Sequence, residues 1–162
     1  LKLLPLYIIC LHKNILLKGG RVSVDFRVYS RMHLSSMSVG ELTIALYPRM
    51  FALHSMPENA GTQGDDGYII LPPWERLLNQ SLQSNGCYLL DNGRRMFLWI
   101  GRDVDPQFSS RVFNQTESGG FAFASNDDPL ASRVKAIISA VQLEHPSYKL
   151  LVIAKQGGDN EL

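Results

Sequence analysis

The stretch GCYLLDNGRRMFLWIG, residues 86–101, decides the fold that this sequence predicts. Its centre, Asn92-Gly93, is a pair favoured in two-residue hairpin turns, because both positions of such a turn adopt positive φ. A two-residue turn sets the cross-strand pairs Asp91–Arg94, Leu90–Arg95, Leu89–Met96, Tyr88–Phe97, Cys87–Leu98 and Gly86–Trp99. We therefore predict a β-hairpin at the centre of a small binding domain.

Both faces of this hairpin are apolar beyond the turn. Leu89 and Met96 share one face with Cys87. The other face carries the aromatic residues, Tyr88, Phe97 and Trp99. A sheet that is apolar on both faces has to be covered on both, so we expect helices above and below the hairpin. Gly86 opposite Trp99 should leave room for the indole ring.

Downstream of the hairpin, two Asp-Pro pairs predict helix starts, because aspartate caps a helix and proline fits its first turn. Asp105-Pro106 begins a short helix through Val112, and Asp128-Pro129 begins a longer one through Leu143. The apolar run Tyr148–Ala154 predicts a central strand. On the longer helix we expect a buried stripe of Leu130, Val134, Ile137, Ile138 and Val141, with Arg133, Lys135, Ser139 and Gln142 facing water.

Upstream of the hairpin, the first fifty residues predict helices. Residues 1–11 predict a buried helix that ends before Lys18-Gly19-Gly20. A second helix starts at Ser23 or Asp25, and a third is capped by Ser38 and Glu41 and stops at Tyr47. The apolar residues of the second helix are Val28, Tyr29 and Met32, and we expect the apolar faces of these helices to be buried against another layer.

Between the third helix and the hairpin the composition changes. Residues 57–67 are polar and rich in glycine, which predicts a linker or a long loop. Tyr68–Leu71 then predicts a short strand, and Trp74–Ser84 predicts a short helix.

Composition and charge argue against a nucleic-acid partner. The chain has 162 residues and a formal net charge of +1. Residues 1–60 carry seven Lys/Arg against three Asp/Glu, and residues 61–162 carry nine against twelve. The basic residues of the first part stand singly, without the interleaved aromatic residues of a single-strand binder.

The sequence predicts no enzyme, and no catalytic, metal-binding or cofactor-binding residue. The stretch GTQGDDG, residues 61–67, lacks the Gly-Lys-Ser/Thr ending of a phosphate loop. Cys10 and Cys87 stand in apolar runs without a CxxC pair, which favours two buried thiols in a reducing compartment. The histidines are scattered and are interpreted as surface or cap residues: His12, His33, His54 and His145.

The remaining candidate site is a surface for partner contact. It consists of Trp74 and of the pair Arg94-Arg95 at the hairpin turn. Two arginines at a turn are usually solvated, with Asp91 as the partner of one of them. The alternative is that the pair contacts a partner protein or a membrane surface.

Seven segments, in this order, resemble the C-terminal part of the cargo-adaptor subunit of the COPII vesicle coat, the Sec24 family of protein transport proteins. They are LKLLPLYIICLHKNILLKGG (1–20), DFRVYS (25–30), LTIALYPRMFALH (42–54), LPP (71–73), GCYLLDNGRRMFLWIG (86–101), ASRVKAIISAV (131–141) and LLVIAKQGGDNE (150–161). Together they cover nearly the whole chain, and the hairpin ending in WIG is the most specific.

The resemblance implies an α/β fold, a gelsolin-like domain with a mixed sheet packed between helices, preceded by a short all-helical segment. Residues 1–56 would end an all-helical domain, 57–67 would be a linker or loop, and 68–162 would be a gelsolin-like domain that stops short at its C-terminus. Phe26 departs from the family, which often has an acidic residue there.

The resemblance also implies a function without catalysis, in cargo selection and in transport from the endoplasmic reticulum to the Golgi. The implied partners of the full-length protein are a Sec23-type coat subunit and membrane cargo proteins, at the cytosolic face of the endoplasmic reticulum and on COPII vesicles. The family's structural zinc belongs to an upstream cysteine cluster that this chain does not include. Since the chain begins without methionine, we interpret it as a piece of a longer protein.

The alternative function is that of a calcium-dependent, actin-binding gelsolin repeat, which the same fold would permit. Such a repeat needs acidic ligands beside the hairpin and on the long helix, where Arg133 and Lys135 are expected at exposed positions. Asp65-Asp66 lies in a loop without further ligands, and Asp127-Asp128 is explained by helix capping. A small hydrolase or nucleotide enzyme is disfavoured, because no nucleophile, base or phosphate loop is present.

Overall fold

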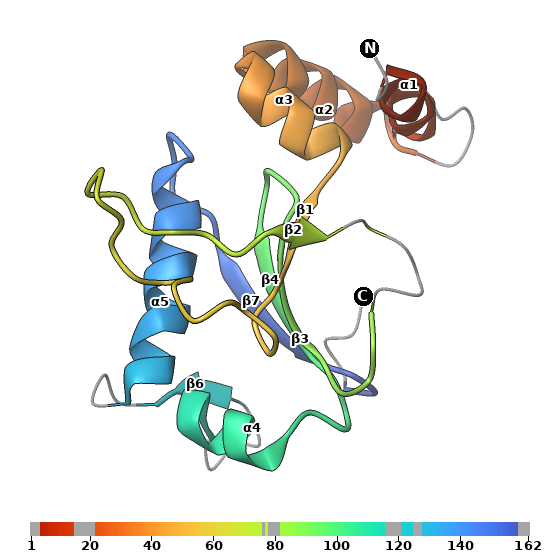
Figure 1. Ribbon diagram of the computed structural model, residues 1–162. Helices are drawn as coiled ribbons and strands as arrows, with labels where there is room; N and C mark the ends of the chain where they lie inside the picture. The colour runs from red at the N-terminus through yellow and green to blue at the C-terminus, as the bar shows by residue number, and fades with distance from the viewer. Residues whose placement is uncertain are drawn as a thin grey trace.

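The computed structural model describes residues 4–14, 22–75, 77, 82–115, 121–124 and 128–158, and shows a mixed sheet with helices (Figure 1). Its helices are α1 (Leu4–Lys13), α2 (Val24–Ser36), α3 (Val39–Leu46), α4 (Pro106–Val112) and α5 (Pro129–Leu143). Its strands are β1 (Arg49–Ala52), β2 (Trp74–Glu75), β3 (Cys87–Asp91), β4 (Met96–Ile100), β5 (Phe113–Gln115), β6 (Phe121–Phe123) and β7 (Leu151–Lys155).

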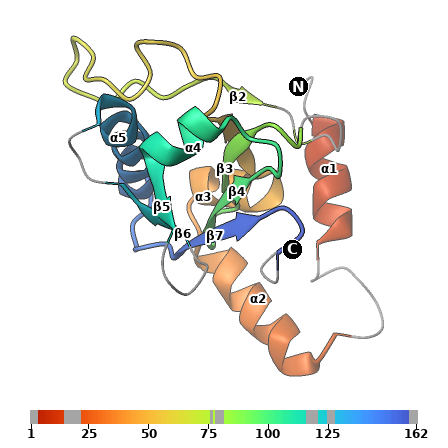
Figure 2. The ribbon, with the colours of Figure 1, turned by 90° about the horizontal axis from the view of Figure 1, so that it is seen from below.

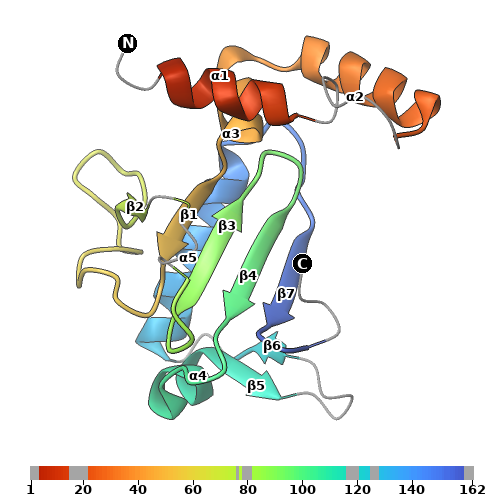
Figure 3. The same cartoon turned by 90° about the vertical axis from the view of Figure 1, so that its right-hand side faces the viewer.

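The main sheet has the order β2-β1-β3-β4-β7, and β5 and β6 form a separate two-stranded sheet. β3 lies in the middle, antiparallel to both β1 and β4, whereas β7 runs parallel to β4 (Figure 3). In the part of the chain that is described, β7 is therefore an edge strand, and the prediction of a central strand at Tyr148–Ala154 is wrong. Its residues Leu151, Val152 and Ile153 are only partly buried, as an edge position allows.

The hairpin β3–β4 forms, but its register differs from the predicted one by two residues. Asp91 pairs with Met96, Leu89 with Leu98, and Cys87 with Ile100. The connection consists of residues 92–95, since Oδ1 of Asn92 accepts hydrogen bonds from the backbone N–H groups of Arg94 and Arg95. Of the two turn residues only Gly93 has positive φ (75°), so the predicted two-residue turn is absent. A shift of two residues leaves every side chain on its expected face.

One face of the sheet packs against α5 and α4 and holds the main core. Leu89, Leu98 and Ile100 meet the α5 stripe of Val134, Ile137 and Val141, and each of these side chains is 0–1% exposed. Asp105 caps α4 and Asp128 caps α5, as predicted. Truncating one such buried leucine to alanine costs about 2–5 kcal/mol, so this layer anchors the fold.

The other face of the sheet has a smaller cluster of Met50, Ala52 and Tyr88, with Trp99 partly buried beside it. No helix among the described residues covers this face. Helices α1–α3 instead lie across the end of the sheet where β3 turns into β4 (Figures 1 and 3). The room beside Gly86 is occupied by the ring of Tyr88, 2.3 Å from where a Cβ would stand, and not by Trp99 as predicted.

Helices α2 and α3 begin where the sequence predicts. Ser23 caps α2, and Ser38 and Glu41 form a complete capping box at α3, which ends at Tyr47. A hydrogen bond from the backbone N–H of Ser38 lowers the pKa of Glu41.

The burial expected for the first two helices is not found. α1 has no buried residue, and the apolar residues assigned to the core side of α2 are exposed: Val28, Tyr29 and Met32. The break predicted at Lys18-Gly19-Gly20 lies outside the described residues.

The secondary structure from β1 to the start of β3 differs most from the predicted one. Arg49–Ala52, where no strand was predicted, pairs with β3 along its whole length. Trp74–Glu75 is strand β2 and not the start of a helix, and most of residues 76–84 lie outside the described part. Within the predicted strand Tyr68–Leu71, only an isolated bridge from Ile69 to Gln63 forms.

Residues 57–70 form a loop that lies along α5 (Figure 1). Arg133 of α5 donates hydrogen bonds to the backbone oxygens of Ala60 and Pro57. Lys135 likewise donates to the backbone oxygen of Ala124. The prediction that Arg133 and Lys135 face water is therefore wrong, since both bond to backbone oxygens. Arg133 therefore holds the loop against the helix.

The predicted fold class is confirmed, as a mixed α/β chain in which helices precede a mixed sheet. The division at residues 56 and 68 stays a prediction, although β1 shows that residues 49–52 pack with the sheet.

Candidate functional site

Trp74 lies on the edge strand β2, and its side chain is 52% exposed. Its ring meets that of Tyr47 edge-on, with 6.4 Å between centroids, and Tyr47 meets Tyr7 of α1 in the same way at 6.3 Å. Trp74 thus connects the sheet to α1 and to the end of α3. The rest of its surface is open to a partner.

Arg94 and Arg95 are the exposed residues of the turn between β3 and β4. The guanidinium of Arg94 lies over two rings of α2, 5.9 Å from the centroid of Phe26 and 5.6 Å from that of Tyr29. Such cation–π contacts hold the cation in place at an exposed site. Within the described residues, Arg95 makes no hydrogen bond or ion pair through its side chain.

The turn and α2 enclose a groove of about 510 Å³, here called the turn groove. Its lining residues are Phe26, Tyr29, His33, Asn92, Arg94, Arg95, Phe97, Ser147, Tyr148 and Lys149. The set includes two arginines and a lysine but no carboxylate. The turn groove is therefore a cationic site with aromatic walls.

The structure brings Arg94 and Arg95 together but places Trp74 elsewhere, since Trp74 does not line the turn groove. The sequence interpretation missed Phe26, Tyr29 and Lys149. The spacing of Phe26, Tyr29 and His33 along one helix face was the available signal, but the helix was interpreted from Val28, Tyr29 and Met32, and His33 was interpreted as a surface or cap residue.

Beside the turn groove lies a buried charge cluster that the sequence interpretation also missed. Asp91, whose side chain is 0% exposed, accepts from Arg49 at 2.8 Å and contacts Nε2 of His145 at 3.0 Å. Arg49 also pairs with Glu144 at 2.6 Å. Asp91 was expected to pair with Arg94 or Arg95, and His145 was expected to be a surface or cap residue. Both predictions are wrong, because His145 is buried and the C-cap of α5 is Glu144.

The charge cluster has direct electrostatic consequences. Burial alone would lower the pKa of Arg49, but its hydrogen bonds to Asp91 and Glu144 raise that pKa above the usual value. Nε of Arg49 and Nδ1 of His145 are buried and have no hydrogen-bond partner in the described part of the chain. The cluster serves packing between β1, β3 and the end of α5.

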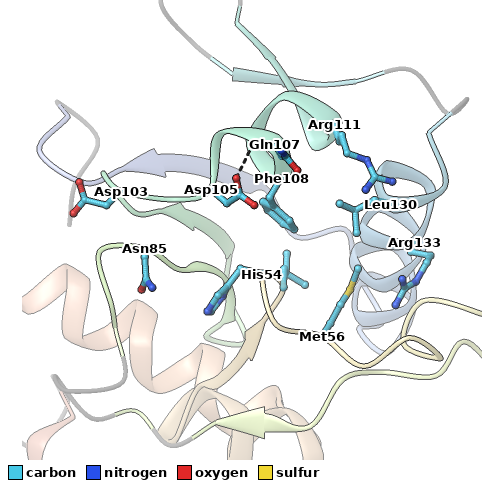
Figure 4. A pocket seen from close by; sticks show the side chains of 11 residues that line it. His54, Met56, Asn85, Asp103, Asp105, Gln107, Phe108, Arg111, Leu130 and Arg133 are labelled. Carbon is cyan, nitrogen blue, oxygen red and sulfur yellow. Dashed lines mark hydrogen bonds between the residues drawn. The ribbon is translucent and has the colours of Figure 1, made fainter.

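A second hollow, of about 530 Å³, lies between α4, α5 and the chain after β1 (Figure 4). Several of its polar side chains already have structural partners. Asp105 accepts from the backbone of Gln107, Arg111 pairs with Asp128, and Nδ1 of His54 accepts from the backbone N–H of Cys87. We assign no chemistry to this hollow.

His54 and the cysteines also depart in part from expectation. His54 is partly buried against β3 and is not a surface histidine. Cys87 is fully buried, and burial raises the pKa of its thiol to about 12. Cys10, which was also expected to be buried, is only half-buried.

The described residues contain neither a cluster of metal-ligating side chains nor a helix suited to span a membrane. No group of three or more His, Cys, Asp or Glu side chains is placed to hold a metal ion. None of the described helices combines the length and the apolar character needed to span a bilayer.

Two family models match the chain in adjacent parts. The Sec23/Sec24 helical domain matches residues 1–44, and the Gelsolin repeat matches residues 69–144. The first match covers the helical segment, and the second covers β3, β4, α4 and α5.

Curated proteins and solved structures agree with these matches. Human protein transport protein Sec24C is 32% identical over all of this chain, and the Sec24 protein of Aspergillus oryzae is 35% identical over 83% of it. The crystal structure of the human COPII-coat protein Sec24c superposes with a TM-score of 0.79 and 30% identity over 98% of this chain. The chain spans 15% of the human relative, 16% of the Aspergillus relative and 21% of the crystallised chain.

Proposed function

Because the chain belongs to the Sec24 family of protein transport proteins, we propose that it is part of a COPII coat subunit that acts in cargo selection and in transport from the endoplasmic reticulum to the Golgi. One observation carries this proposal. The similarity to human Sec24c runs through 98% of the chain, across both the helical segment and the sheet. An isolated gelsolin repeat would match only the second of these parts.

We propose that the chain functions by binding other proteins, without catalysis and without binding nucleic acid. Its proposed partners are a Sec23-type coat subunit and membrane cargo proteins, reached through the full-length protein. The proposed location is the cytosolic face of the endoplasmic reticulum membrane and of COPII vesicles. The exposed candidates for contact are Trp74, Arg94 and Arg95. We propose that the chain needs no cofactor, and that the family's zinc is held by a segment upstream of it.

A chimera of human Sec24C tests the proposal, since the chain is 32% identical over its whole length to that protein. The matching segment of human Sec24C is replaced by this chain, and cargo packaging is measured in vesicles budded with purified coat proteins. We expect the chimera to bind the Sec23-type subunit and to package cargo. A folded chimera that packages no cargo contradicts the proposal.

A matched control tests whether the three candidate side chains contact a partner, and the triple variant must keep its unfolding midpoint because Trp74 also packs against Tyr47. In the chimera, the triple substitution Trp74→Ala, Arg94→Gln and Arg95→Gln should lower packaging. Arg102→Gln, which removes an exposed arginine just beyond the opposite end of β4, should not. Equal packaging by the two variants would remove these three residues from the proposal.

The actin-binding alternative makes a different prediction. Arg133, which lies on α5, donates its hydrogen bonds to the loop backbone, so this part of the helix offers an arginine where a calcium site would need acids. We expect no change in the thermal unfolding midpoint on adding calcium, zinc or nucleotide. An upward shift with calcium, together with cosedimentation with actin filaments, would favour the alternative.

A further inference from the structure

We propose that a pocket between α3 and the end of α5 binds an arginine or lysine side chain of a partner protein. This pocket, here called the α3–α5 pocket, has a volume of about 500 Å³ and lies where the end of α5 comes up beneath α3 (Figure 3). The lining residues that carry the proposal are Gly40, Glu41, Ile44, Leu143, Glu144 and His145. None of them is among the contact candidates named above, so the proposal rests on the proposed function only in taking a protein as the partner.

The charge of the α3–α5 pocket is negative. Its described lining includes two carboxylates, those of Glu41 and Glu144, and no lysine or arginine. Oε2 of Glu41 accepts from the backbone N–H of Ser38 at 2.9 Å, and Oε2 of Glu144 accepts from Arg49 at 2.6 Å. The other oxygen of each carboxylate, Oε1, has no hydrogen-bond partner among the described residues. Both carboxylates can therefore accept from a ligand.

The cations outside the pocket do not neutralise both carboxylates. Arg49 is shared, because it also pairs with the buried carboxylate of Asp91 at 2.8 Å, so one guanidinium faces two acids. Lys149 acts on Glu41 only through the electric field, since its Nζ donates its hydrogen bond to Ser147 and it does not line the pocket. A further cation is therefore attracted to this place.

Glu41 is ionised at neutral pH. The hydrogen bond from the backbone of Ser38 lowers the pKa of Glu41 most, and the Ser38 hydroxyl and the charge of Lys149 lower it further. The carboxylate thus stays negative under the conditions in which a partner would bind.

His145 has an unpaired nitrogen beside these carboxylates. Its side chain is 1% exposed, and Nε2 lies 3.0 Å from the carboxylate of Asp91. A carboxylate only accepts, so Nε2 carries the hydrogen, and in the neutral ring Nδ1 is then an acceptor. Nδ1 is buried and has no hydrogen-bond partner in the described part of the chain, whereas buried polar atoms usually have one.

The three acceptors together select a ligand that only donates hydrogen bonds. The guanidinium of arginine and the ammonium of lysine are such groups, and both carry the opposite charge. A metal ion fits less well, because no group of three or more metal-ligating side chains is placed to hold one among the described residues. Phosphate-bearing partners are repelled by the two carboxylates.

The apolar part of the pocket fits the stem of a long basic side chain. Ile44 and Leu143 line it, and Leu143 is 84% exposed although it is a large apolar residue. Lysine and arginine bury their methylene groups against such surfaces while the charged end reaches a polar group. The end of α5 is also the negative end of its helix dipole, and the last turn of α5 has no basic residue.

Fluorescence anisotropy with the purified chain tests the proposal. The probe is a short labelled peptide in which arginine alternates with leucine. In the control peptide, citrulline replaces every arginine, which keeps the shape of the side chain and removes its charge. We expect only the arginine peptide to bind, with an affinity that falls as salt is added.

Substitution of the carboxylates should weaken binding without unfolding the protein. Glu41→Gln keeps the cap of α3, because glutamine also serves in a capping box, and should weaken binding about fivefold. Glu144→Gln keeps an acceptor for Arg49 and should also weaken binding about fivefold. The matched control is Glu58→Gln, at an exposed carboxylate outside the pocket, which should leave binding unchanged.

A second variant blocks the pocket and leaves its charges in place. The nearest atom that a Cβ on Gly40 would meet is Oγ of Ser38, at 4.0 Å, so a side chain fits there and extends into the pocket. Gly40→Met should weaken binding about tenfold or more without lowering the unfolding midpoint, because methionine favours helices more than glycine does. Val39→Met, at an exposed position of the same turn that does not line the pocket, should bind normally.

Several outcomes overturn the proposal. Equal binding of the citrulline peptide does so, as does an equal loss in Glu58→Gln and Glu41→Gln, or normal binding by Gly40→Met. Absence of peptide binding also overturns it. If the chain then self-associates in sedimentation equilibrium and Gly40→Met abolishes this, the occupant is a second copy of the chain.

The Sec24C chimera distinguishes this proposal from the proposed function. Packaging of cargo by the chimera, with no binding of the arginine peptide by the chain, refutes only the pocket proposal. Binding of the arginine peptide by a folded chimera that packages no cargo refutes the coat function and leaves the pocket proposal standing.

Discussion

At the scale of single residues, Asp91 shows what sequence can and cannot predict. Its place at the end of a strand, before a turn, follows from local pattern. Its partners do not, because Arg49 is 42 residues away and His145 is 54 residues away in sequence. The nearby arginines at the turn were the obvious candidates, yet they point to α2 and to solvent. Only the pairing of β1 with β3 brings Arg49 beside Asp91.

Removing the charge of Asp91 should destabilise the protein strongly. In Asp91→Asn the buried side of Arg49 loses its counter-ion, and removal of one member of a buried pair costs about 3 kcal/mol. Urea denaturation should show this as a lower midpoint. Asp103→Asn, at an exposed carboxylate, is the matched control and should change stability by less than about 0.5 kcal/mol. Equal effects in the two variants would show that the cluster does not stabilise the fold.

The two cysteines should react differently with an alkylating reagent. The thiolate is the reactive form, and burial raises the pKa of Cys87 to about 12, so this thiol stays protonated at neutral pH. Cys10 is half-buried on α1. Mass spectrometry after iodoacetamide treatment of the folded protein should find Cys10 modified first, with Cys87 modified only after urea is added. Early modification of Cys87 would contradict its burial.

At the scale of elements, the helix starts were predictable and the strand pairing was not. A capping box such as Ser38 with Glu41 depends on residues three apart, so the sequence contains all the necessary information. The hairpin register depends on the Asn92 side chain, which bonds to two backbone groups and lengthens the turn to four residues. β2 forms because Trp74 and Glu75 pair with the edge of β1. The local sequence around Trp74 does not reveal this partner.

The loop over α5 gives a sharp test with two glycines. Gly61 and Gly67 both have positive φ, 79° and 81°, so alanine is strained at either position. A Cβ at position 61 would also lie 2.6 Å from the backbone oxygen of Arg133, whereas at position 67 the nearest atom is 3.8 Å away. Thermal unfolding should therefore show a clearly larger loss for Gly61→Ala than for Gly67→Ala. Similar losses would mean that the loop is not held against the helix.

At the scale of the whole molecule, the helical segment and the sheet meet around the hairpin turn. Backbone atoms of Ala45 in α3 come within 3.2–3.3 Å of where a Cβ on Gly93 would stand, and Arg94 lies over the rings of α2. Figure 2, which views the molecule from below, shows α2 extending away beside the sheet. The two arginines of the site were predictable as exposed turn residues. The rest of the turn groove was not, because it needs α2 and the segment before β7 to come together in space.

Trp74 should matter for how firmly α1 and α3 are held. Its edge-on contact with Tyr47, and that of Tyr47 with Tyr7, form a chain of rings, and each such pair contributes about 0.5–1.5 kcal/mol. In Trp74→Ala, hydrogen exchange should become faster in α1 and α3 and stay unchanged at the buried amides of β3. Uniform acceleration throughout the chain would indicate global destabilisation in place of local loosening.

The buried charge cluster around Asp91 also affects the unfolding rate of the protein. Its members belong to β1, β3 and the end of α5. Arg49 and Glu144 are 95 residues apart in sequence, so their contact closes a long loop. Because closing such a long loop is entropically costly, we expect this contact to form late, after the hairpin and the α5 stripe have assembled. Interactions that are absent from the folding transition state act on the unfolding rate. We therefore expect the cluster to slow the opening of the native state, while the rate of its formation is set by the apolar layer between the hairpin and α5.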